Sequence, residues 1–155
     1  MKIGIIGAGR IGQVHARAVA NNPATELAMI CDINAEAASA VTKKFGGQVA
    51  ADADQVINSP EVDAVIICSP TPFHVKQIVD CVKAGKPVLC EKPLAMDSAD
   101  VESLYSQIDG FEAKVMLGFN RRFDPSFAAA KDMADNGELG TVEQVTIISR
   151  DPAAP

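Results

Sequence analysis

Short apolar runs alternate with stretches of helical character along most of the chain, and this alternation constrains its fold most. Five runs are nearly continuous in apolar residues, which is typical of strands covered on both faces: residues 2–6, 26–31, 64–68, 87–90 and 114–118. Four segments between them carry apolar residues at helical spacing: residues 10–21, 34–45, 73–84 and 97–108. A short strand at 48–49 and a short helix at 52–58 complete the pattern. It predicts an α/β domain with a doubly wound parallel sheet.

The pattern changes after Gly118. Residues 119–125 form a polar connection, 126–134 have helical character, and 142–149 are predicted to form one more strand before the proline-rich end Asp151-Pro-Ala-Ala-Pro. We therefore expect a nucleotide-binding domain over 1–118, and a junction with the truncated start of a substrate domain over 119–155. Complete proteins usually cover such a strand edge, so the sequence is expected to be a piece of a longer protein.

Composition and charge exclude several classes of protein. The chain has 155 residues, 48% of them apolar, which suffices for one well-packed domain. Fourteen basic and 20 acidic residues give a net charge of −6 without a basic stripe, which argues against nucleic acid as a partner. No apolar run approaches the roughly 20 residues that span a bilayer, and the first residues do not resemble a signal peptide. We expect a cytoplasmic protein with no membrane partner.

The four cysteines show neither a C-x-x-C motif nor a pairing with histidine. Three of them, Cys31, Cys68 and Cys90, end predicted strands, and Cys81 lies in a predicted helix. They are expected to be buried thiols in a reducing compartment, with no metal site and no disulfide.

A glycine loop follows the first predicted strand and begins the first helix. Residues 7–12, Gly-Ala-Gly-Arg-Ile-Gly, match G-x-G-x-x-G in the context that the motif requires. Gly7 permits a tight turn, Gly9 lets a pyrophosphate approach the backbone, and Gly12 allows close helix–strand packing. The free N–H groups of the helix then favour phosphate. The predicted cofactor-binding residues here are Gly7, Gly9, Arg10, Ile11 and Gly12.

Asp32 lies 20 residues beyond Gly12, at the end of the second predicted strand. A carboxylate there accepts hydrogen bonds from the adenosine ribose and repels a 2′-phosphate, which favours NAD over NADP. The alternative for Asp32 is a carboxylate that only stabilises the N-terminus of the next helix. The alternatives for the glycine motif are a chance glycine-rich turn and the glycine loop of an S-adenosylmethionine-dependent methyltransferase.

A more specific signature is the segment Glu91-Lys-Pro-Leu-Ala95. Together with the glycine loop, Ser69-Pro-Thr-Pro-Phe-His74 and Gly118-Phe-Asn-Arg-Arg-Phe-Asp124, it resembles the Gfo/Idh/MocA family of oxidoreductases along essentially the whole chain. The resemblance implies an N-terminal Rossmann domain followed by an α/β domain with a large open sheet. It also implies NAD(P)-dependent oxidation or reduction of a sugar, an inositol or a related polyol. The full-length protein would then be a homo-oligomer.

The resemblance also implies roles for individual residues. Lys92 would be the catalytic residue, in contact with the substrate hydroxyl, and its place just past a strand end supports this role independently. Arg121 would bind polyol hydroxyls. The remaining cofactor contacts would be Ser69, Thr71, His74, Glu91 and Asn120. The non-functional alternatives are a solvated side chain at Lys92, a helix-capping or exposed side chain at His74, and an interdomain salt bridge at Arg121. His15 is expected to pack against the fold or to cap a helix.

One feature departs from the family. Its catalytic set usually includes an Asp and a His four residues apart in the second domain, whereas the only histidines here, His15 and His74, both precede residue 91. We therefore expect a chain that binds NAD but does not oxidise inositol alone. An aldose or another sugar as substrate, and a dinucleotide-sensing regulator without catalysis, stay open; a regulator has no need of Lys92.

Overall fold

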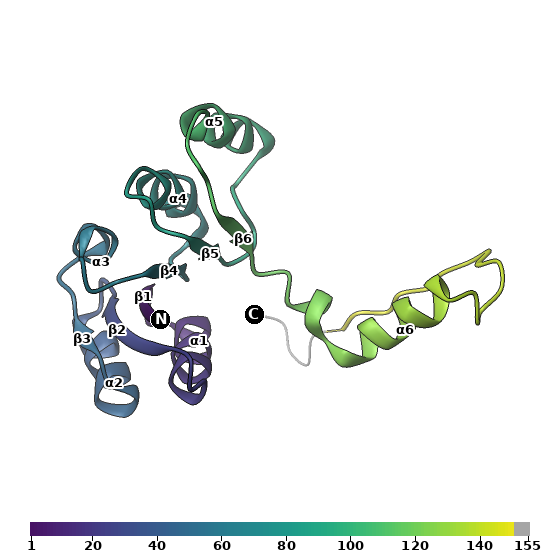
Figure 1. The fold of residues 1–155 in the computed structure, drawn as a ribbon, viewed down its shortest axis with the longest axis horizontal. Coiled ribbons are helices and arrows are strands. Elements are labelled where there is room, and N and C mark those ends of the chain that lie inside the picture. The colour runs from purple at the N-terminus through teal and green to yellow at the C-terminus, as the bar shows by residue number, and fades with distance from the viewer. Residues whose placement is uncertain (151–155) are drawn as a thin grey trace. The chain divides into compact units, whose positions relative to one another are not determined.

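The computed structural model describes residues 1–150, which form two units, Met1–Gly118 and a second unit that begins at Phe119. The first unit is a parallel sheet of six strands with helices on both faces (Figure 1). Its strands are β1 (Lys2–Ile6), β2 (Glu26–Cys31), β3 (Gln48–Val49), β4 (Ala64–Ile67), β5 (Val88–Cys90) and β6 (Val115–Leu117). Its helices are α1 (Arg10–Asn21), α2 (Ala35–Phe45), α3 (Ala53–Asn58), the 3₁₀ helix η1 (Thr71–Phe73), α4 (His74–Lys83) and α5 (Ser98–Ile108). The predicted fold class is confirmed, and the ends of these elements differ from the predicted ones by at most one residue.

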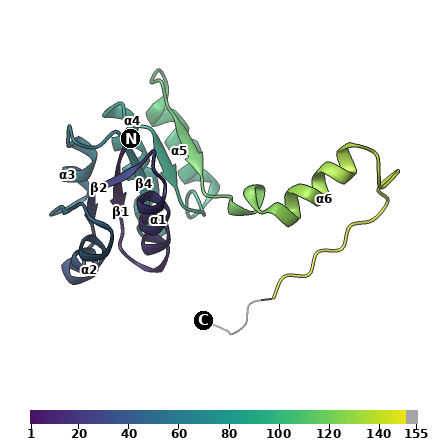
Figure 2. The same cartoon turned by 60° about the horizontal axis from the view of Figure 1, so that its bottom comes forward.

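The strands lie in the order β3-β2-β1-β4-β5-β6. The central strand β1 lies between β2 and β4 (Figure 2). Ile5 is paired with Ile30 on one side and with Ile66 on the other. The direction in which strands are added reverses between β1 and β4. Doubly wound sheets leave a crevice at this point, outside the carboxyl ends of the strands.

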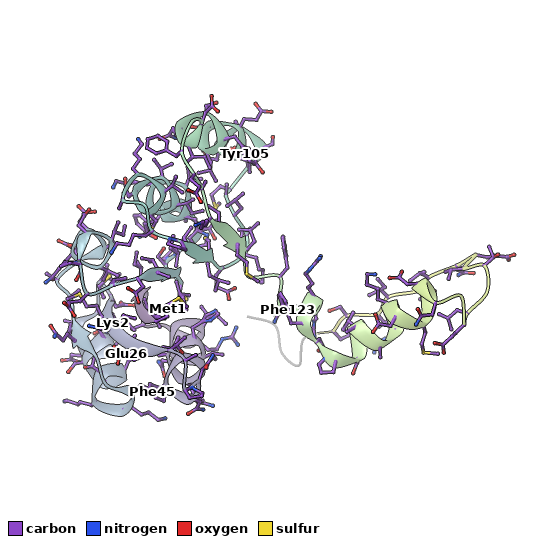
Figure 3. All side chains as sticks on the ribbon, viewed as in Figure 1. Met1, Lys2, Glu26, Phe45, Tyr105 and Phe123 are labelled. Atoms are coloured by element: carbon purple, nitrogen blue, oxygen red, sulfur yellow. The ribbon has the colours of Figure 1, made fainter. Side chains whose placement is uncertain are left out.

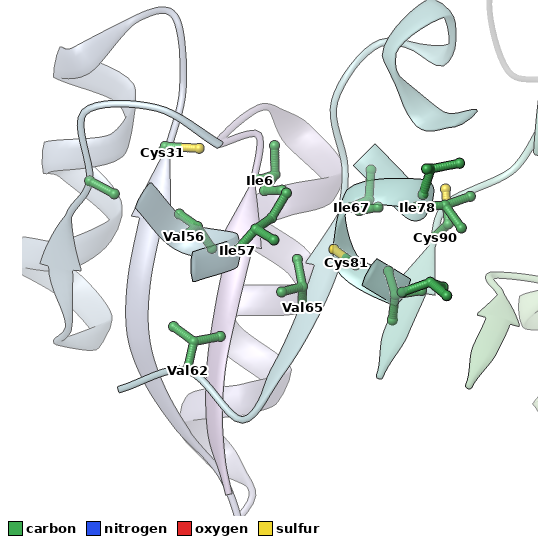
Figure 4. Close-up of a cluster of buried hydrophobic side chains, with 14 of the residues drawn as sticks. Ile6, Cys31, Val56, Ile57, Val62, Val65, Ile67, Ile78, Cys81 and Cys90 are labelled. Atoms are coloured by element: carbon green, nitrogen blue, oxygen red, sulfur yellow. The ribbon is translucent and has the colours of Figure 1, made fainter. Parts of the chain in front are cut away.

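Two apolar clusters cover the two faces of the sheet. Ile3 and Ile5 of β1 pack in the cluster under α1 and α2, whereas Ile6 belongs to the larger cluster under α3, α4 and α5 (Figure 4). This alternation follows from the two-residue repeat of a strand. Gly4 faces the larger cluster, where a Cβ atom would lie 2.5 Å from Val56 Cγ1. Both faces are therefore dry, and a ligand can reach only an edge of the sheet.

Backbone and ionic contacts hold the amino-terminal edge of the sheet. Met1, Lys2 and Glu26 lie there, at the starts of β1 and β2 (Figure 3). The terminal ammonium donates to the Ala24 carbonyl at 2.8 Å, and Lys2 Nζ pairs with Glu61 at 2.5 Å. The opposite, carboxyl edge carries the glycine loop and Asp32.

The second unit contains a 3₁₀ helix η2 (Asn120–Phe123) within the predicted connection, and helix α6 (Pro125–Asp135). The predicted strand at 142–149 is wrong, because these residues have no regular secondary structure. A strand needs a neighbour for its backbone hydrogen bonds, and none of the described residues pairs with this segment. Its apolar side chains are exposed, Ile147 to 78%. The end Asp151-Pro-Ala-Ala-Pro lies outside the described residues.

Candidate functional site: a dinucleotide cleft

Each of the three motif glycines in the loop after β1 is required for a different steric reason. Gly7 has φ +101°, and a Cβ atom there would lie 2.6 Å from the Cys68 carbonyl oxygen. A Cβ on Gly12 would lie 2.0 Å from the Gly7 carbonyl oxygen. A Cβ on Gly9 would meet nothing within 4 Å. Gly7 and Gly12 thus permit the packing of the loop, while the space beside Gly9 is open for a ligand to approach the backbone.

Helix α1 begins at this loop with no side-chain cap on its first N–H groups. These donors and the helix dipole favour an anion at that end. Arg10 and Ile11 lie in the first turn of α1 and are exposed, Ile11 to 39%. The arrangement suits a pyrophosphate group.

Hydrogen bonds fix the Asp32 carboxylate at the end of β2. Its Oδ2 accepts from the Ala8 N–H at 2.6 Å, and its Oδ1 accepts from the Asn34 N–H at 2.8 Å. The first bond joins Asp32 to the glycine loop, 24 residues earlier in the chain. The carboxylate is therefore oriented before any ligand binds.

A cleft of about 580 Å³ runs along the carboxyl ends of β1, β2 and β4. Its volume lies within the usual range for small-molecule sites. The predicted residues that line it are Gly7, Gly9, Asp32 and Ser69. Other lining residues were not predicted: Ile33, Ala51, Asp52, Ala53, Pro70, Phe73 and Gln77.

Two of these unpredicted residues are exposed apolar side chains. Ile33 is fully exposed beside Asp32, and Phe73 is 54% exposed at the end of η1. Both offer an apolar surface on which the flat face of a heterocycle can lie. Ile33 could have been predicted from the sequence, because it is an aliphatic residue directly after Asp32. Phe73 could not, because its position in the cleft depends on the turn η1.

The loop after β4 brings Ser69 and His74 together. Ser69 Oγ donates to Gln77 Oε1 at 2.6 Å, and Thr71 begins η1 half-buried. His74 is 1% exposed, with Nδ1 2.8 Å from the Pro93 carbonyl oxygen and Nε2 2.8 Å from that of Ser69. Each ring nitrogen therefore faces a backbone carbonyl oxygen, and the buried ring is not directed into the cleft.

Glu91 follows β5 and lies against α1 and β6. His15 Nε2 donates to Glu91 Oε1 at 2.7 Å, with the two side chains 22% and 15% exposed. The carboxylate also abuts Gly118, where a Cβ atom would lie 3.0 Å from Oε1. His15, expected only to pack or cap, thus has a specific polar partner.

Lys92 is exposed at the carboxyl end of β5, and a cis peptide bond joins it to Pro93. Its backbone N–H donates to Glu91 Oε2 at 3.3 Å. Lys92 therefore belongs to the same edge of the sheet as the glycine loop, on the side of β4 and β5.

Asn120 and Arg121 lie in η2 of the second unit, and Asn120 is exposed. Arg121 Nη1 lies 3.3 Å from Asp124 Oδ2, and its guanidinium carbon lies 5.3 Å from the centre of the Phe127 ring. Both partners belong to the same unit. Roles for Asn120 and Arg121 toward nicotinamide and polyol stay predictions.

Two thiols lie beside the cleft but are not reactive groups. Burial raises the pKa of Cys31 to about 11 and that of Cys68 to about 12. Both therefore stay protonated near neutral pH and cannot act as nucleophiles there. Within residues 1–150, no group of three or more His, Cys, Asp or Glu could hold a metal ion. No helix in that range is long and apolar enough to cross a membrane.

The profile of an oxidoreductase family with an NAD-binding Rossmann fold, Gfo/Idh/MocA, matches residues 1–119. The chain belongs to this family. The predicted family, the Rossmann fold and NAD as the cofactor of this domain are thereby confirmed.

Inositol dehydrogenases are among the similar Gfo/Idh/MocA proteins. The inositol 2-dehydrogenase of Rhizobium meliloti (strain 1021) is 43% identical over 155 residues, and the myo-inositol 2-dehydrogenase of Thermotoga maritima is 38% identical over 156; each alignment covers the whole chain and 47% of the relative. The chain thus spans about half the length of these relatives.

Solved structures agree with this family membership. A myo-inositol dehydrogenase from Corynebacterium glutamicum superimposes with a TM-score of 0.93 at 46% identity, over all of this chain and 47% of that one. A scyllo-inositol dehydrogenase from Lactobacillus casei, solved with NAD(H) and scyllo-inositol, gives 0.82 at 35% identity, over 90% of this chain and 42% of that one.

Proposed function

We propose that this chain is the NAD-binding part of a dehydrogenase that oxidises a secondary alcohol of a cyclic polyol, of which myo-inositol is the first candidate. The observation that carries the proposal is the shared edge of the sheet. Asp32, the glycine loop and Lys92 all follow the carboxyl ends of strands, in the spatial order β2, β1 and β5. The names of the relatives support inositol as the substrate.

The residues of the cleft fit NAD. Asp32 would accept hydrogen bonds from the adenosine ribose, and the open space beside Gly9 would admit the pyrophosphate to the uncapped start of α1. Ile33 and Phe73 would give the heterocycle an apolar surface. Strand order then directs the nicotinamide half past β4 toward Glu91 and Lys92. Ser69, Thr71 and Asn120 are further proposed contacts.

Lys92 would carry out the proton chemistry. The bound nicotinamide would supply the hydride acceptor. The Lys92 amine would hold the alcohol hydroxyl by a hydrogen bond and take its proton as the carbonyl forms. Arg121 would hold neighbouring hydroxyls of the polyol. A positioned general base is worth about 10²–10⁴ in rate.

A chimera tests this proposal. This chain would replace the corresponding part of the Rhizobium meliloti relative, with which it shares 43% identity. NAD reduction would be followed at 340 nm with myo-inositol, scyllo-inositol and an aldose. We expect activity with an inositol in the chimera and none in the 155-residue chain.

A matched variant separates chemistry from cofactor binding. Lys92→Met in the chimera should lower the rate at least about 100-fold, the lower bound for a general base, with little change in the Kd for NAD. Lys114→Met, at the opposite edge of the sheet, should change neither. Retained activity in Lys92→Met would exclude the proposed role, and a preference for the aldose would exclude inositol.

We further propose that the full-length protein is a cytoplasmic homo-oligomer of polyol metabolism. The four cysteines, Cys31, Cys68, Cys81 and Cys90, are free thiols, which suits a reducing compartment. Size-exclusion chromatography with light scattering on the chimera tests the oligomer, and fluorescence localisation of the tagged protein tests the compartment.

A further inference from the structure

Both histidines of the chain contact the segment that carries Lys92. His15 comes from α1 and His74 from α4, on opposite faces of the sheet, yet one binds Glu91 and the other binds Pro93. We propose that His15 and His74 are positioning residues that hold Lys92 by fixing the residue on each side of it. This inference rests on the proposed role of Lys92.

The contact from α1 fixes the Glu91 side chain. His15 Nε2 donates to Oε1 at 2.7 Å, and the pair is mostly buried. Gly118 leaves room for the carboxylate on another side, and the Lys92 N–H donates to Oε2 at 3.3 Å. With contacts on both oxygens, the carboxylate has one favoured orientation, and the backbone at Lys92 is tied to it.

The contact from α4 fixes the backbone at Pro93. The His74 ring lies between two carbonyl oxygens, those of Pro93 and Ser69, at 2.8 Å each. Carbonyl oxygens only accept hydrogen bonds, so a ring protonated on both nitrogens satisfies both and a neutral ring satisfies one. A ring with its N–H on Nδ1 donates to Pro93 and packs against the Ser69 carbonyl, so His74 lies between the loop after β4 and the segment after β5, two strands that are neighbours in the sheet.

These two contacts affect the position of the Lys92 amine. A lysine side chain has a flexible four-carbon stem, so its accuracy depends on the backbone from which it extends. A displacement of about 1 Å at a reacting group can lower the rate about 100-fold. Fixing Glu91 and Pro93 limits the positions of the Lys92 backbone, although neither histidine need touch substrate.

Two readouts on the 155-residue chain test this proposal. The first is amide hydrogen exchange of the peptide over residues 90–95. The second is the ratio of the Kd for ADP-ribose to that for NAD, which isolates the nicotinamide half. His15→Leu should speed exchange in this peptide, because Glu91 loses its partner. The ratio should fall about tenfold, the effect of one hydrogen bond to a charged group, because Glu91 is the proposed contact of the nicotinamide half. Binding of ADP-ribose itself should change less than about twofold.

Conservative and control variants distinguish positioning from a general loss of structure. His15→Gln keeps an N–H donor and should restore most of the ratio, whereas Lys2→Met, which breaks the Lys2–Glu61 pair at the other edge, should leave exchange and ratio unchanged. His74→Leu, which removes both ring nitrogens, should show the same two effects as His15→Leu. If the His74 variant does not fold, the His15 variants alone test the positioning role.

The outcomes separate this proposal from the proposed function. Unchanged exchange at 90–95 in folded His15→Leu would overturn the positioning role, even if the chain binds NAD tightly. Faster exchange with an unchanged Kd ratio would equally overturn the positioning role, because Glu91 would then bind the nicotinamide half without its His15 contact. A wild-type chain that binds neither NAD nor ADP-ribose would instead overturn the proposed function, while the exchange measurement would still judge the histidine contacts.

Discussion

The Asp32 carboxylate accepts a hydrogen bond from the Ala8 N–H, 2.6 Å away, and so joins the end of β2 to the glycine loop after β1. Asp32 and Gly7, beside Ala8, both line the cleft. A second bond, from the Asn34 N–H, holds the other oxygen at 2.8 Å. A ligand therefore meets an acceptor whose orientation is already set, which lowers the entropic cost of binding.

Replacing Asp32 by Asn removes the charge and keeps one of the two acceptor oxygens. The single amide oxygen of Asp32→Asn can still accept from Ala8, but its amide nitrogen would then face the Asn34 N–H, so the melting temperature should fall modestly. NAD binding should weaken about tenfold, because the hydrogen bonds from the ribose lose their charged acceptor, and the preference for NAD over NADP should fall. Isothermal titration with both nucleotides measures this. The exposed Glu61→Gln is the control, and an unaltered preference in Asp32→Asn would refute the assignment.

The loop glycines should separate stability from binding. Gly12→Ala places a Cβ 2.0 Å from the Gly7 carbonyl oxygen, so it should lower the melting temperature clearly. Gly9→Ala meets no protein atom within 4 Å, so the chain should fold nearly as well but bind NAD much more weakly. Calorimetric melting with and without NAD compares the two. Normal NAD affinity in Gly9→Ala would show that the pyrophosphate lies elsewhere.

Buried thiols should make the fold sensitive to alkali. Burial raises the pKa of Cys81 and Cys90 to about 12, whereas an unfolded thiol ionises near its ordinary value of about 8.5. Between these values the unfolded chain releases protons that the folded chain keeps. The free energy of unfolding should therefore fall as pH rises above about 8.5.

Urea unfolding from pH 7.5 to 10.5 under reducing conditions measures that slope. Cys81→Ala removes one such thiol and should flatten the slope, although it lowers stability at every pH because it leaves a cavity. Equal slopes for the wild type and Cys81→Ala would argue that this thiol is not buried in solution.

The sequence predicted those parts of the fold that repeat locally. Continuous apolar runs predicted strands such as β4, and the spacing of Gly7, Gly9 and Gly12 predicted the loop. The strand expected at 142–149 is absent, because a strand depends on a partner as much as on its own apolar residues. The local sequence pattern indicates the propensity of a segment to form a strand, but not whether another strand pairs with it.

Contacts in the site between residues far apart in the sequence could not be predicted from local sequence patterns. His15 and Glu91 are 76 residues apart, and nothing near His15 indicates that α1 faces the end of β5. His74 was predicted as a cofactor contact, but its ring is buried between two carbonyl groups. Motif spacing places a residue at an edge of the sheet, whereas the packing of helices decides what its side chain touches.

Competitive titration of the 155-residue chain with NAD, NADP and S-adenosylmethionine tests the central claim most directly. The fixed Asp32 carboxylate predicts that NAD binds at least about tenfold more tightly than NADP, since a 2′-phosphate would meet a negative charge, and that S-adenosylmethionine does not compete. Tighter binding of NADP, or displacement of NAD by S-adenosylmethionine, would contradict the account.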